Sequence, residues 1–118
     1  MSFSSAGKAV CIVAVVTAVA QLRPVSAQFM QAMHANMERM DHQMTAATMN
    51  GNVDHDFAAM MIPHHQGAID MAKAELTYGK DPVIRRLAQE ILVDQQSEIE
   101  AMELWLRKAA GASPKKEK

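Results

Sequence analysis

The sequence predicts an all-α protein, an up-down bundle of three main helices. Apolar side chains recur at steps of three and four residues, and strand-like alternation is absent. Two turn clusters, at residues 50–52 and 79–82, divide the pattern into three helical stretches. Connections this short join antiparallel neighbours. The core of so short a bundle is thin, and self-association is one way to complete it.

The first 27 residues predict a cleavable export signal. Residues 9–20 form an apolar run, which is shorter than the roughly 20 residues that a membrane-spanning helix needs. Val25-Ser26-Ala27 supplies the small residues of a cleavage site. An uncleaved membrane anchor is the alternative. Cleavage after Ala27 would leave no stable membrane insertion, and it would remove Cys11, so that neither a disulfide nor a thiolate ligand remains.

The charge pattern excludes nucleic acid as a partner. The formal net charge is −1, and the sequence contains no basic stripe and no aromatic platform. After the signal over residues 1–27, we expect a helical metal-binding domain over 28–111 and a disordered tail over 112–118.

The first helix, expected from about Gln28 to Thr48, carries a stripe of methionines. Residues 28–50 contain no Leu, Ile or Val. Methionine is flexible and apolar, so an unusual core is the alternative interpretation. A core of methionine alone is poorly specified, and the pattern therefore favours sulfur ligands for a soft metal ion, most simply Cu(I). The candidate ligands, at 3-4-3-4 spacing with one histidine at the flank, are Met30, Met33, Met37, Met40, Met44 and His34.

The second helix is expected from Asp54, whose carboxylate caps its start, to Tyr78. Pro63 lies inside it and predicts a kink or a helix restart, because proline removes one backbone hydrogen bond.

The same helix carries the second group of candidate ligands. A methionine precedes two adjacent histidines by three and four residues, so one cation could contact sulfur and imidazole together. Both histidines are expected to lean inward, where two aspartates would orient the imidazoles by accepting hydrogen bonds. The ligands are Met61, His64, His65 and Met71, and the aspartates are Asp54 and Asp70.

The third helix is expected from Asp81-Pro82 to about Ala110, because an acceptor followed by proline is a favourable helix start. Met102 is its candidate ligand and would complete the site of the second helix. It belongs to an otherwise ordinary core stripe, formed by Ile84, Ala88, Ile91, Ile99, Met102 and Leu106.

The ligand types favour copper over zinc and over catalysis. Thioether sulfur needs no deprotonation and binds Cu(I), and neutral imidazole serves either oxidation state of copper. Zinc prefers Cys and His ligands. The sequence lacks the Glu-x-x-His pairs of a di-iron oxidase and any nucleophile–histidine arrangement, so we do not expect an enzyme.

Residues 54–72, which read DHDFAAMMIPHHQGAIDMA, resemble the signature of domain of unknown function family 305. Residues 88–106 are similar to the same family, so that the resemblance covers 54–106 and leaves out the methionine stripe. It implies an exported, ferritin-like helical protein with a periplasmic copper-binding role like that of the CopM-type members. The residues that it carries over are Met61, His64, His65, Met71 and Met102.

These observations give two hypotheses. The first is a periplasmic protein that sequesters or delivers Cu(I) and supports copper homeostasis, with a partner that receives the ion. In that case the second helix holds one site, and the first-helix methionines hold a more exchangeable one. The alternative is an interaction module that docks a partner helix or another copy through its methionine-rich surface.

Overall fold

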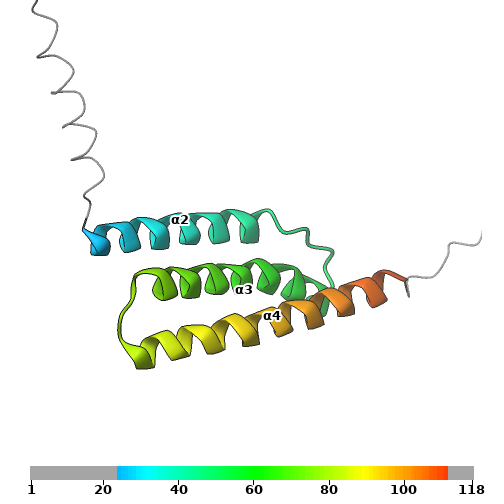
Figure 1. Ribbon diagram of the computed structural model, residues 1–118. Coiled ribbons are helices and arrows are strands. Elements are labelled where there is room, and N and C mark those ends of the chain that lie inside the picture. The colour runs from blue at the N-terminus through cyan, green and yellow to red at the C-terminus, as the bar shows by residue number, and fades with distance from the viewer. Residues whose placement is uncertain (1–23, 112–118) are drawn as a thin grey trace, which may run out of the picture.

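The computed structural model describes residues 24–111, which form α2 (Val25–Thr45), α3 (Val53–Tyr78) and α4 (Pro82–Gly111). Consecutive helices run antiparallel, and α3 lies in the middle with α2 and α4 on either side (Figure 1). The all-α, up-down prediction is therefore confirmed. Most of the expected signal, Cys11 and the tail from residue 112 lie outside the described residues.

The helix starts differ from expectation at two places. α2 begins at Val25, so the expected cleavage motif forms its first turn, and it ends at Thr45. α3 begins at Val53, and its cap is Asn52, whose side chain accepts a hydrogen bond from the N–H of His55 at 3.0 Å. The cap predicted at Asp54 is wrong, because that residue already lies inside the first helical turn.

The other two predictions about helix ends concern Pro63 and Asp81. α3 continues through Pro63, so the helix does not restart there. The cap at Asp81 is confirmed: its Oδ1 accepts the N–H groups of Val83 at 2.9 Å and Ile84 at 3.0 Å. At the turn before α3, Gly51 adopts a φ of 85°, which glycine permits without strain.

α3 packs against its two neighbours through small side chains. Its buried positions form two groups on different sides of the helix, namely Gly67 and Ala74 toward α2, and Ala58, Ile69 and Ala72 toward α4. From α4, Ala88 and Ile99 are buried, whereas no residue of α2 is. Alanine dominates this core, so it buries little apolar area.

The outer helices do not close the bundle. Within residues 24–111, no Cα atom of α2 lies within 8 Å of a Cα atom of α4. The three helices consequently form an open layer with two sides. None of these helices combines the length and apolar character that crossing a bilayer requires.

One side of the layer is polar. Asp70 of α3 forms an ion pair with Arg39 of α2 at 3.0 Å, and it accepts a hydrogen bond from Gln66 at 3.2 Å. Lys73 lies 3.7 Å from the same carboxylate. Helical periodicity places Gln66, Asp70 and Lys73 on one line of α3.

Candidate metal-binding face

The other side of the layer, called the open face below, carries two depressions. A groove of about 300 Å³ lies between α2 and α4, and a second hollow of about 310 Å³ lies where α3 begins. Both lie on one side, because Phe57 and Met71 are about four helical turns apart on α3, and Leu87 and Trp105 five turns apart on α4. The groove is lined by Phe29, Met33, Ala68, Met71, Ala72, Glu75, Ile84, Leu87, Ala88 and Ile91. The second hollow is lined by Asp54, Phe57, Ala58, Ala101, Met102 and Trp105.

The register between α2 and α3 follows from contacts along their length. The rings of Phe29 and Tyr78 lie 6.4 Å apart, edge to face, and the Arg39–Asp70 pair follows three turns further along α2. Each step forward along α2 therefore matches one step back along α3. Continued to the end of α2, this register places Met44 opposite His64.

The register between α3 and α4 follows in the same way. Arg85 donates to the backbone carbonyl of Leu76 at 2.6 Å, and Glu98 accepts from His65 at 2.6 Å. Extending this register by one further helical turn places Met102 of α4 opposite Met61 of α3.

Four predicted ligands consequently lie at one level of the layer and are called the Met–His cluster: Met44, Met61, His64 and Met102. Met33 of α2 and Ile84 of α4 line the groove. Met44 lies three full turns from Met33, and Met102 five full turns from Ile84, so both point to the same side of their helices as the groove residues. The three methionines are half-buried, and His64 is exposed. The register therefore places one methionine of each helix and one imidazole near the same level of the open face.

The two adjacent histidines have different environments. Their ring centroids lie 5.9 Å apart, and their side chains leave α3 about 100° apart. The His65 ring contacts the carbonyl oxygen of Met61 at 2.8 Å through Nδ1 and the Glu98 carboxylate through Nε2. Among the described residues, no hydrogen bond or ion pair engages the His64 imidazole. The prediction that both histidines lean inward is therefore wrong: His65 turns toward α4, and the nitrogen atoms of His64 are available.

The methionine stripe of α2 is divided by its packing. Met40 packs on α3 so closely that a Cβ atom added at Gly67 would lie 2.5 Å from its sulfur. Met33 lines the groove together with Met71. At the outer edge, Met30 and Met37 are 48% and 50% exposed. His34 is exposed as well, beyond that edge. The stripe thus provides packing, groove-lining and solvent-facing sulfur atoms.

The carboxylates contact groups other than those expected. Asp70 was expected to orient an imidazole, but it pairs with Arg39, Gln66 and Lys73 on the polar side. Asp54 is exposed and lines the second hollow. Of the adjacent histidines, His65 is oriented by the carboxylate of Glu98, which sequence reasoning missed.

Met60 also escaped the sequence analysis. It is half-buried, and it lies three turns before Met71 on the same line of α3. Over residues 24–111, no group of three or more His, Cys, Asp or Glu side chains is arranged to hold a metal ion. A metal site in this part of the chain would therefore depend on thioether sulfur.

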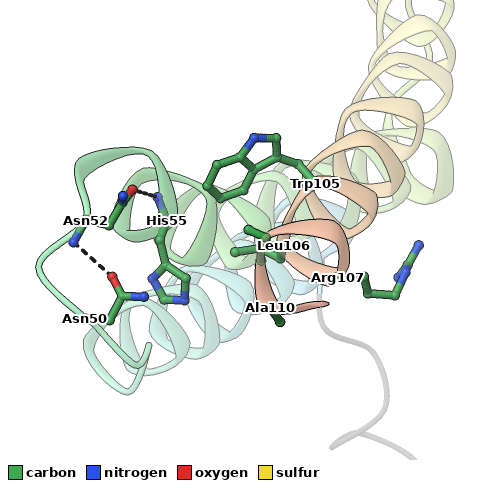
Figure 2. Close-up of a pocket in the computed structure, with 8 residues that line it drawn as sticks. Asn50, Asn52, His55, Trp105, Leu106, Arg107 and Ala110 are labelled. Carbon is green, nitrogen blue, oxygen red and sulfur yellow. Dashed lines mark hydrogen bonds between the residues drawn. The ribbon is translucent and has the colours of Figure 1, made fainter. Parts of the chain in front are cut away.

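A larger hollow, of about 750 Å³, lies at the end of the layer between the α2–α3 loop and α4. Figure 2 shows Asn50, Asn52 and His55 on the loop side, with Trp105 and Leu106 across from them. The asparagine side chains are engaged in the loop, since Asn50 accepts from the N–H of Asn52 at 2.9 Å. This hollow contains none of the predicted ligands.

Asp56 holds the same loop together. Its carboxylate accepts the N–H groups of Asn50 at 2.8 Å and Gly51 at 3.1 Å, and it contacts the His55 ring at 3.0 Å. These interactions, led by the Asn50 hydrogen bond and then by that of His55, lower the pKa of Asp56 against the opposing effect of burial. The loop that positions α3 therefore depends on an ionised carboxylate.

Comparison with known proteins extends the resemblance noted in the sequence. Residues 14–106 match the family described as domain of unknown function (DUF305). That range includes all of α2, and thus the methionine stripe. An uncharacterized protein of Acanthamoeba polyphaga mimivirus is 45% identical over 49 residues, which are 42% of this chain and 32% of the viral protein. The chain thus spans about a third of the length of that curated relative.

Proposed function

The chain belongs to the domain of unknown function 305 (DUF305) family, and from this premise we propose that it binds Cu(I) through methionine sulfur and histidine nitrogen on the open face. The observation that carries the proposal is the register of the three helices, which places Met44, Met61 and Met102 near the level of His64. Thioethers are soft ligands that prefer Cu(I), and imidazole adds a nitrogen ligand. The proposed role is to sequester or deliver copper in support of copper homeostasis.

Within the cluster, His64 is the proposed nitrogen ligand and His65 a positioning residue. Both ring nitrogens of His65 are engaged, by the Met61 carbonyl and by Glu98. Using His65 as a ligand would require that at least one of these contacts be broken. His64 needs no such rearrangement, because its exposed ring has no competing partner among the described residues.

The groove is the proposed second and more exchangeable copper position. It brings together Met33 from α2 and Met71 from α3, and the exposed Met37 lies about one helical turn from Met33. These ligands are thioethers, which bind Cu(I) without releasing a proton. Weak, accessible sulfur ligands of this kind suit an ion that is passed on to a partner.

Copper handling of this type belongs in an exported compartment, and we propose that residues 1–27 direct the chain there. An oxidising compartment makes thiolate ligands hazardous, whereas thioethers do not form disulfides. The intact mass of the exported protein tests the proposal. A mass equal to that of a chain starting at Gln28 supports export with cleavage. A mass that includes residues 1–27, found in a membrane fraction, supports an anchor.

The decisive experiment is an anaerobic titration with Cu(I) against a chromogenic competing chelator, with Zn(II) in parallel. The ligand variant combines Met44→Leu, Met61→Leu and Met102→Leu, which removes sulfur and keeps apolar volume. The matched control is Met49→Leu, whose side chain is 44% exposed outside the helices. We expect the wild type and the control to compete equally, and the ligand variant to lose at least about tenfold in affinity, or about 1.4 kcal/mol.

The two histidines provide a second matched pair. We expect His64→Ala to weaken copper binding and to leave unfolding by urea nearly unchanged. His65→Ala should do the reverse, because it removes a contact between α3 and α4. Equal copper affinity in the wild type and in the triple methionine variant would refute the cluster. Uptake of Zn(II) as tight as that of Cu(I) would contradict the choice of metal.

A second function, docking of a protein partner, is favoured by a separate observation. Large apolar side chains on the open face are exposed, among them Phe57 at 61% and Leu87 at 50%. A metal site alone does not require them.

A further inference from the structure

We infer that the open face is the surface on which a second copy of this chain packs, independently of copper. Domains are built from at least two packed layers around a core, and the described part of this chain forms a single layer. Its buried apolar residues are four alanines, Ile69 and Ile99. A layer with so small a core needs its apolar side covered.

Only one side of the layer suits this role. The opposite side carries Asp70 with its two ion-pair partners, Arg39 and Lys73, and these charges would lose water contacts if they were covered. On the open face, the groove and the second hollow are lined mainly by aliphatic, aromatic and methionine side chains. A symmetric dimer uses the same patch on both copies, so the two open faces would meet.

The extent of the face identifies a second copy as the occupant. Its exposed side chains come from all three helices: Met37 of α2 is 50% exposed, Phe57 of α3 61% and Trp105 of α4 40%. A single helix in the groove between α2 and α4 would leave the outer side chains uncovered. Another three-helix layer matches the face in both width and length.

The area available is also sufficient. Six large side chains on this face are each roughly half exposed, and together they present on the order of 500 Å². The half-buried residues that line the groove add to this area. A stable interface of ordinary size needs about 800 Å² per partner, which the whole face can supply. The six are Met30, Met37, Phe57, Ile84, Leu87 and Trp105.

Sedimentation of the purified protein, in buffer with a Cu(I) chelator and EDTA, tests the inference. We expect a concentration-dependent dimer. The interface variant is Leu87→Glu, and the matched control is Val93→Glu on the same helix, where Val93 is 70% exposed outside both depressions. The interface variant should raise the dimer dissociation constant at least about tenfold, and the control should leave it unchanged. Circular dichroism checks that both variants remain helical.

A measurement on the wild type does not depend on either variant. Trp105 is the only tryptophan of the chain and lies on the proposed interface, so its emission should shift to shorter wavelength as the protein is concentrated. A wild type that sediments as a monomer up to its solubility limit would overturn the inference and leave the face to another occupant, such as residues 1–23 or a different protein. Equal changes in the dimer dissociation constant for Leu87→Glu and Val93→Glu would also overturn the inference. Because copper is chelated throughout, neither result depends on the copper proposal.

Discussion

The two interfaces of α3 differ in how they are built. Toward α4, branched aliphatic side chains and alanines are buried, Glu98 holds His65, and Arg85 donates to the carbonyl groups of Leu76 and Gly79 at the end of α3. Toward α2, contact depends on a thioether seated on a glycine, one ion pair and one pair of rings.

This difference separates a scaffold from an adaptable element. Methionine has three rotatable bonds and adjusts to its surroundings, whereas Ile and Ala pack in few conformations. α2 buries no residue completely, although it supplies most of the candidate sulfur ligands. The α3–α4 hairpin therefore positions the imidazole, and α2 provides ligands that can rearrange around an ion.

The largest effect is expected from a substitution in the core of the α3–α4 hairpin. Ile99 is 6% exposed, and Ile99→Ala should lower the free energy of unfolding by about 2–5 kcal/mol through lost burial and a cavity. Met44→Ala, which truncates a half-buried side chain of α2, should lower it by less than half as much. Urea unfolding followed by circular dichroism, without copper, compares them. Equal losses would show that α2 is as much a part of the scaffold as α4.

Copper should act mainly on the adaptable element. A ligand present at 100 times its dissociation constant stabilises the folded state by about 2.7 kcal/mol. If Cu(I) binds the Met–His cluster, amide hydrogen exchange should slow most in α2, which has the weaker packing and so the lower stability without the ion. Exchange in the middle of α4 should change least. Uniform slowing along all three helices would argue against a separate role for α2.

A smaller effect is expected at the contact between α2 and α3. Gly67→Ala should gain about 1 kcal/mol of helix propensity but lose about 1–3 kcal/mol through overpacking against Met40, for a net loss near 1 kcal/mol. Combined with Met40→Ala, the same alanine should become neutral or stabilising, because the obstructing side chain is gone. Additive effects of the two changes in a double-mutant cycle would contradict this contact.

The smallest effect concerns pH and the loop before α3. The pKa of Asp56 is lowered in the folded protein, so its contribution to stability is fully present above the ordinary aspartate range and is lost as pH falls through the lowered value. Asp56→Asn should remove that dependence. Amide exchange at the start of α3 below about pH 4 is the measurement, with Asp54→Asn as the control. Identical acid profiles for the wild type and Asp56→Asn would rule out this role.

Much of this architecture could be predicted from residue patterns alone. The three helices and the cap at Asp81 follow from periodicity and turn residues. What could not be predicted depends on register between helices. Asp70 pairs with Arg39 instead of an imidazole, and Glu98 contacts His65, because a chain pattern gives the side of one helix and not the residue opposite. His64 and His65 likewise differ only because one faces α4.

The unequal exposure of the α2 methionines also sets an order of chemical damage. Peroxides transfer an oxygen atom to accessible thioethers first and convert them into polar sulfoxides. In a single copy of the chain, before a second layer covers the open face, Met30 and Met37 are about half exposed, whereas Met40 is seated against the backbone of α3. The outer pair should therefore be consumed first and shield the half-buried sulfur atoms of the cluster. A chain that meets oxidants would lose its peripheral sulfur long before it loses the contact that joins α2 to the rest.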